Sequence, residues 1–240
     1  VMLLAGVGQA AEKNIIFFIT DDESPTLGCY GDEVAVTPAI DALAADGTLF
    51  TRAFATTASC SASRSVVMSG LHNHYNGQFG HQHHYHGFSS FPATISLAMP
   101  RVLARAGYRT AHIGKYHVAP EEVFHYETYL KGPARNAVQM AENCRDFINN
   151  RKDGRPFFLY FATSDPHRGG GKDQDSVREL KPDLFGNKRH DESWSGVKEI
   201  FYDPMEVVIP HFLSDTPETR EELSQYYQSV SRIDQGLARL

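Results

Sequence analysis

The sequence predicts an α/β fold in which helices cover both faces of a mostly parallel central sheet. Two continuous apolar runs, Asn14–Thr20 and Phe157–Ala162, are typical of strands that are buried on both faces. Segments with helical periodicity lie between them, and strands that alternate with helices build this kind of sandwich. The 240 residues suit one domain of this class or a large part of one.

The first half of the chain continues the alternation. A helix is predicted from Thr37-Pro38 to Gly47, because threonine is a good N-cap and proline favours the first helical position. Leu49–Phe54 is predicted to be a second strand, followed by a helix from about Arg64 to Ser69. The segment Gly70–Gly87 is rich in His, Gly, Asn and Tyr, which indicates a long loop.

The second half predicts two more helices around a short strand. Pro100–Gly107 is a helix, Thr110–Ile113 a strand and Ala134–Ile148 an amphipathic helix. Gly169–Asp203 is polar and lacks periodicity, which indicates a loop. Thr216-Pro217 opens a final helix that is expected to run to the last residue, with Thr216 as its cap.

Composition excludes some classes of protein. The chain has 23 basic and 29 acidic residues, a net charge of −6, which argues against a general nucleic-acid binder. No run is long enough to span a bilayer. The first eleven residues, Val1–Ala11, resemble the end of a secretory signal, which predicts export to the periplasm, lysosome or medium; a buried strand or helix is the alternative. Residues 12–240 would then form the folded domain.

The three cysteines are Cys29, Cys60 and Cys144. Cys29 and Cys144 could pair in an exported protein, but two free thiols are the expectation, because spacing alone cannot establish a disulfide. Cys60 lies among small residues in Ser59–Arg64 (SCSASR), before the apolar run that begins at Val66. A buried, inert cysteine is the alternative reading of that motif.

Polar motifs follow three of the predicted strands, where open α/β sheets bind ligands. Asp21-Asp22 follows the first strand, and the pair would suit a calcium or magnesium ion, although a solvated turn is the alternative. Gly114–His117 and Ser164–Arg168 follow two later strands. The cluster His81, His83, His84 and His86 lacks the spacing usual for zinc, so it is expected to line the rim of a pocket.

These motifs, in this order, resemble those of the type I sulfatase family of the alkaline phosphatase superfamily. Ser59–Arg64 matches its C-x-[P/A]-S-R signature, and Gly114–His117 resembles its G-K-W-H element with Tyr116 in place of tryptophan. The resemblance implies that a maturation enzyme oxidises Cys60 to formylglycine. The hydrated aldehyde would attack sulfur and later expel sulfate, which divides one difficult step into two easier ones.

The resemblance also implies a role for each site residue. Asp21, Asp22 and the modified Cys60 would hold Ca²⁺, with Mg²⁺ as the alternative. Arg64 would hold the formylglycine, and His117 would act as base for the elimination of sulfate. The residues expected to contact the substrate are Lys115, which binds a sulfate oxygen, His167, which also protonates the leaving group, and the flanking Asp165 and Arg168.

Within the family, the chain is most similar to enzymes that hydrolyse the N-sulfate of glucosamine in heparan sulfate. An O-sulfatase, a phosphonate monoester hydrolase and a non-catalytic glycan-binding homologue are the alternatives. The family's later Asp-Asn metal pair has no match here, and the last helix shows no stop signal. The chain is therefore expected to be the N-terminal portion of a longer enzyme, for which the resemblance also allows a homodimer.

Overall fold

The computed structural model describes residues 13–82, 87–150, 152–168 and 193–240. Its sheet has four strands in the order β1-β4-β2-β3, and every neighbouring pair is parallel. The strands are β1 (Ile15–Asp21), β2 (Arg109–Gly114), β3 (Thr128–Leu130) and β4 (Phe157–Pro166). The predicted α/β class with a parallel sheet is confirmed.

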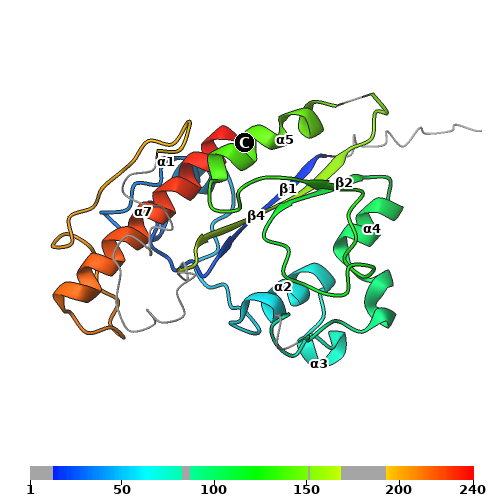
Figure 1. The fold of residues 1–240 in the computed structure, drawn as a ribbon, viewed down its shortest axis with the longest axis horizontal. Coiled ribbons are helices and arrows are strands. Elements are labelled where there is room, and N and C mark those ends of the chain that lie inside the picture. The colour runs from blue at the N-terminus through cyan, green and yellow to red at the C-terminus, as the bar shows by residue number, and fades with distance from the viewer. Residues whose placement is uncertain (1–12, 83–86, 151, 169–192) are drawn as a thin grey trace, which may run out of the picture.

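Helices lie on both sides of this sheet (Figure 1). On one side are α5 (Ala137–Asn149) and α7 (Pro217–Arg239), with α1 (Pro38–Asp46) packed beside α7. On the other side are α2 (Cys60–Ser69) and α4 (Met99–Arg105), with the short α3 (Asn73–Asn76) next to α2. Two short 3₁₀ helices, Gly28–Tyr30 and Pro92–Ser96, complete the elements.

The core explains why β4 reads as a continuous apolar run. Successive side chains of a strand point to opposite faces. Phe158 and Tyr160 therefore pack toward α2 and α4, in a cluster that includes Met68. The alternate residues Phe157, Leu159 and Phe161 pack against Met140 and its neighbours on α5. Both faces of the central strand are dry, so no polar alternation is needed.

Three predictions about local structure were wrong or incomplete. Residues 49–54 form no strand, and Phe50 and Phe54 are 68% and 88% exposed, because this segment pairs with none of the four strands. Thr128–Leu130 joins the sheet as β3 although its three residues carry no periodic signal. The predicted loop Gly70–Gly87 contains the one-turn helix α3.

Capping also differs between the two helices that begin with Thr-Pro. Thr216 caps α7 as predicted, since its side chain accepts a hydrogen bond from the Thr219 amide at 3.2 Å. Thr37 makes no such bond. The free amides of Ala39 and Ile40 instead donate to Asp234 of α7, at 2.9 and 2.8 Å.

The remaining sequence expectations concern the cysteines, membrane spans and segments that lie outside the described residues. Cys29 and Cys144 are free thiols, as expected. Within the part of the chain that the structure describes, no helix is long and apolar enough to cross a membrane. The predicted signal remnant Val1–Ala11, three of the clustered histidines and most of the predicted loop Gly169–Asp203 lie outside the described residues; those histidines are His83, His84 and His86.

Candidate active site

Three neighbouring parallel strands deliver the predicted residues to one edge of the sheet. β1 ends at Asp21, β2 is followed by Lys115 and His117, and β4 is followed by His167. The order β1-β4-β2 places these ends side by side. Cys60, the first residue of α2, lies beside the same edge. Each of the three motifs therefore lies at the carboxyl end of a strand, which is where open α/β sheets bind ligands.

Asp21 is the electrostatic centre of the cluster. It is almost fully buried, and Arg64 donates to its Oδ1 at 2.9 Å while the Lys115 ammonium donates to Oδ2. Burial alone would raise the pKa of Asp21, but the hydrogen bonds from Lys115 and Arg64 outweigh it and lower that pKa. The carboxylate is therefore held in its charged form.

Arg64 is fixed from behind as well. Its Nη1 donates to the Tyr160 hydroxyl and to the Lys115 carbonyl, each at 3.3 Å, and the residue is only 2% exposed. Among its hydrogen bonds to described residues, none reaches Cys60. A contact between Arg64 and the formylglycine therefore stays a prediction.

Cys60 faces the paired carboxylates. Its Sγ lies 3.9 Å from Oδ2 of Asp21 and 3.8 Å from Oδ1 of Asp22. Burial raises the pKa of the Cys60 thiol, and the charge of Asp21 raises it further, although the nearby Lys115 opposes them. An unmodified thiol in this position is protonated and is a weak nucleophile, because the thiolate is the reactive form.

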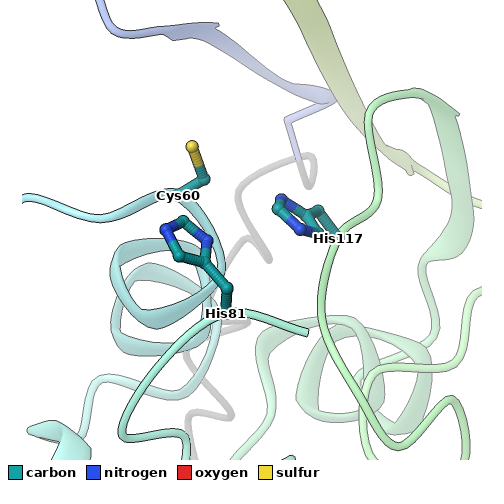
Figure 2. A group of neighbouring side chains, drawn as sticks. All are labelled: Cys60, His81 and His117. Atoms are coloured by element: carbon teal, nitrogen blue, oxygen red, sulfur yellow. The ribbon is translucent and has the colours of Figure 1, made fainter. Parts of the chain in front are cut away.

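Two histidines also lie close to Cys60 (Figure 2). His117 follows β2 with a positive φ of 51°, and its ring stacks at 5.7 Å on that of His81, which comes from the loop after α3. Cys60, His81 and His117 each offer a ligand atom within 4.8 Å of the others. Figure 2 shows the three side chains gathered from separate segments.

His167 lies next to the two aspartates. Its Nδ1 is hydrogen-bonded to the Asp22 carboxylate, and Asp22 adopts a positive φ of 61° that turns it out of β1. Asp21, Asp22, Cys60 and His167 offer a second set of ligand atoms, again within 4.8 Å of one another. The predicted metal ligands and the predicted acid are thus neighbours.

The two carboxylates have the donor chemistry of a site for a hard cation. Asp21 and Asp22 supply oxygen donors next to each other, which is what Ca²⁺ and Mg²⁺ prefer. Calcium takes roughly six to eight oxygen ligands, so these residues supply a part of the set. The donor chemistry fits, and further ligands must complete it.

Two predicted substrate contacts, Asp165 and Arg168, have ion-pair partners within the protein. Asp165 is 1% exposed, and its two oxygens accept from Arg135 and Arg232, each at 3.0 Å. Arg168 pairs with Glu222 of α7. Asp165 is therefore placed to hold the turn that carries His167, and the geometry does not bring it to the cysteine. Arg168 as a substrate contact stays a prediction.

Sequence reasoning did not predict two residues as neighbours of Arg64 and Cys60 that the structure brings there. Tyr160 supports Arg64 from within β4, and it is the only hydroxyl in the apolar run FFLYFA, which is a usable signal. His81 was grouped with other histidines on a pocket rim. Its 21-residue separation from Cys60 gives no periodic or spacing clue, because loop geometry alone joins them.

Curated proteins of known name are similar to this chain in sequence. Human N-sulphoglucosamine sulphohydrolase is 35% identical over 98% of this chain and 48% of its own length. A Bacteroides thetaiotaomicron N-acetylglucosamine-6-O-sulfatase is 28% identical over 67% of this chain and 32% of its own length. The chain thus spans about half, or less, of the length of the curated relatives it matches.

Solved structures place the fold in the same group. A sulfatase structure from Bacteroides fragilis aligns with a TM-score of 0.66 at 18% identity, over 98% of this chain and 59% of the other. A structure in complex with its substrate D-glucosamine-2-N,6-O-disulfate aligns with a TM-score of 0.53 at 26% identity, over 65% and 35%. The family model named Sulfatase matches residues 13–240. The chain therefore belongs to the sulfatase family.

Proposed function

We propose that this chain is the part of a formylglycine-dependent sulfatase that holds the reacting residue, and that the enzyme hydrolyses the N-sulfate of glucosamine in heparan-type saccharides. The observation on which this rests is the position of Cys60 at the start of α2, within 4 Å of Asp21 and Asp22. Lys115, His117 and His167 surround that position with groups that donate and move protons.

The environment of Cys60 argues against the plain thiol as the nucleophile. Its thiol has a raised pKa beside two carboxylates, so the unmodified side chain is unsuited to attack an anionic sulfate. Formylglycine supplies a hydrated aldehyde, one hydroxyl of which attacks sulfur while the other allows sulfate to be expelled. The nucleophile and the later elimination thus come from one residue.

The surrounding residues have distinct tasks. The Lys115 ammonium binds a sulfate oxygen and offsets the charge of Asp21. His117 takes the proton of the second hydroxyl, and His167, oriented by Asp22, gives a proton to the departing amine. A divalent cation, calcium by the donor set, would be held by Asp21, Asp22 and the oxygen at position 60, and it would supply positive charge against the sulfate.

The choice of the N-sulfate rests on similarity. The human relative named N-sulphoglucosamine sulphohydrolase is 35% identical over nearly the whole chain. The structure solved with a glucosamine carrying both N- and 6-O-sulfate supports the same sugar class. An O-sulfatase is the second candidate, because a 6-O-sulfatase acting on N-acetylglucosamine is 28% identical over two thirds of the chain.

The same proposal includes a maturation enzyme that converts Cys60, and export of the protein to a compartment where sulfated glycans are degraded. A homodimer of the full-length enzyme is part of the proposal as well. Each of these rests on the resemblance to the sulfatase family, whose model matches residues 13–240.

The test begins with mass spectrometry of the Cys60 peptide from full-length enzyme produced with a formylglycine-generating enzyme. Formylglycine lowers the mass of the peptide relative to the thiol, and an unmodified thiol in active enzyme would overturn the proposal. Release of sulfate from N-sulfoglucosamine should exceed release from glucosamine 6-sulfate; the reverse order would select the O-sulfatase.

Variants at position 60 supply the control. Cys60→Ala should remove turnover while leaving the free energy of unfolding little changed, and Cys60→Ser should retain a covalent sulfate ester, detectable by mass, if it reacts at all. Full turnover by folded Cys60→Ala would place the reacting group elsewhere.

A further inference from the structure

We propose that the unconverted chain binds a zinc ion through Cys60, His81 and His117, and that this site ceases to exist once Cys60 becomes formylglycine. The zinc site is distinct in its ligands from the carboxylate site for a hard cation, although the two share position 60. Zinc binding itself needs only the thiol form of the chain; its effect on maturation rests on the function proposed above.

The ligand chemistry selects the metal. One sulfur and two imidazole nitrogens suit Zn²⁺, while Ca²⁺ and Mg²⁺ take oxygen donors. The ligand atoms of the three residues lie within 4.8 Å of one another, and ligands bound to one tetrahedral zinc stand about 3.5 Å apart. Closing the set requires a shift of about 1 Å or less per side chain, which rotation about the side-chain bonds provides.

The placement of the ligands is also suited to an ion that enters from solvent. All three residues are half-buried, and they come from the start of α2, the loop after α3 and the loop after β2. Three protein ligands leave a fourth position for water, as in zinc sites that are open to solvent. Figure 2 shows the rings of His81 and His117 beside the same cysteine.

The orientation of His81 is fixed by a neighbour. Its Nε2 is hydrogen-bonded to the Ser59 hydroxyl at 2.8 Å. Histidines that bind metals generally use one ring nitrogen as ligand and hydrogen-bond the other to a supporting group, which sets the tautomer. The Ser59 hydroxyl is placed to act as such a supporting group for His81.

Binding of Zn²⁺ releases one proton from the Cys60 thiol. Zn²⁺ replaces the hydrogen of the Cys60 thiol, the proton passes to solvent, and the S–Zn bond forms with no change of oxidation state. Formylglycine has no sulfur, so conversion removes one of the three ligands. A bound zinc in turn occupies the sulfur that the maturation enzyme must oxidise. Zinc binding and maturation therefore exclude each other.

The test uses Co²⁺ as a spectroscopic substitute for zinc, added to full-length protein produced without the maturation enzyme. Wild type should bind one Co²⁺ with the near-ultraviolet charge-transfer band of a cobalt–thiolate bond, and Zn²⁺ should displace it. Cys60→Ala should lose the band. His81→Ala should weaken binding by roughly 100-fold or more, because loss of even a supporting residue costs metal sites about 10–100-fold.

The matched control is His72→Ala, which removes an exposed histidine that stacks on His74 outside the set and should leave the cobalt spectrum unchanged. A spectrum retained in Cys60→Ala would assign the metal to the carboxylates and overturn the proposal. Failure of wild type to bind Co²⁺ or Zn²⁺ would overturn it equally.

A second measurement separates this proposal from the proposed function. The thiol form is treated with a formylglycine-generating enzyme with and without equimolar zinc, and the Cys60 peptide is weighed. Zinc should block conversion of wild type but not of His81→Ala, which controls for inhibition of the maturation enzyme itself. A chain that binds zinc but carries no formylglycine even when it is produced together with the maturation enzyme would refute the proposed function and leave the zinc site standing.

Discussion

At the residue scale, Asp21 is both a buried side chain and a proposed metal ligand that must stay charged. These two requirements conflict unless cationic groups surround the carboxylate. A buried carboxylate is costly unless it is paired and hydrogen-bonded. Arg64 and Lys115 provide that pairing, and Tyr160 holds Arg64 in place from the core side. Asp22 differs, because its side chain is 52% exposed and it is paired with His167 alone among the described ion pairs. The two adjacent acids are therefore energetically unequal.

This inequality predicts different effects of the same substitution. Asp21→Asn should lower the free energy of unfolding by about 3–5 kcal/mol, because it leaves Arg64 buried without its carboxylate. Asp22→Asn should change it by about 1 kcal/mol or less, since exposed pairs contribute little. Denaturant titration measures both values.

Calcium titration provides the second readout for these two variants. Both should lose the rise in melting temperature that calcium gives the wild type, because each removes a proposed ligand. Equal losses of stability, or calcium stabilisation retained in both variants, would contradict this assignment.

At the scale of elements, the sequence predicted best where one segment determines its own structure. The strands Asn14–Thr20 and Phe157–Ala162 and the final helix have strong local patterns, and all three formed. The first strand and the helix lie within one residue of their predicted bounds, whereas β4 continues past Ala162 to Pro166. Leu49–Phe54 has a similar apolar content but finds no partner strand. The fate of such a segment is decided by pairing with distant residues, which local periodicity does not record.

The same distinction applies to the candidate site. Asp21, Lys115 and His167 were predictable because each follows a strand, and the ends of parallel strands meet at one edge of a sheet. His81 reaches Cys60 through the course of a loop, and Asp234 caps α1 from a helix almost 200 residues away. Asp165 is adjacent to His167 in sequence, yet two arginines hold it below the surface.

The end of β2 depends on a glycine. Gly114 has a φ of +89°, and a Cβ there would lie 2.0 Å from the Ala162 carbonyl oxygen of β4. Gly114→Ala should therefore lower the free energy of unfolding by roughly 2–5 kcal/mol, the sum of left-handed strain and overpacking. It should also displace Lys115 and reduce sulfate release by full-length enzyme.

Gly107→Ala is the matched control for this prediction. Gly107 has a similar φ of +94°, but a Cβ there would meet nothing within 4 Å. It should lose only the strain energy, about 1–2 kcal/mol, and retain activity. Equal effects of the two substitutions in denaturant titration would show that close packing against β4 is unimportant.

At the scale of the whole molecule, the site and the core share residues. His112 of β2 is 4% exposed and lies among aromatic rings, with Tyr160 stacked on it at 5.7 Å and Tyr116 edge-on at 5.2 Å. Burial lowers the pKa of His112 to about 4, and the charge of Arg64 adds to that effect, against a hydrogen bond to the Lys115 backbone. A charged residue of the site, Arg64, thus lowers the pKa of His112 in the core.

The pH dependence of global stability follows from this pKa. The unfolded chain binds a proton at His112 below its ordinary value of 6.5, whereas the folded chain does so only near 4. The contribution of neutral His112 is therefore complete above pH 6.5 and is lost as the pH falls from 6.5 to about 4. The loss amounts to about 3 kcal/mol at most, at 1.4 kcal/mol per unit of pKa difference.

Substitution of this histidine tests the linkage. His112→Phe should lower the free energy of unfolding at pH 7, because the hydrogen bond to the Lys115 backbone is lost, but it should flatten the decline toward pH 4. The difference between wild type and variant should therefore shrink steadily as the pH falls. Urea titrations at half-unit intervals between pH 7.5 and 4 measure it, with the exposed His211→Phe as control. A difference that stays constant across that range would show that the pKa of His112 is the same in the folded and the unfolded chain, which would contradict the effect of its burial.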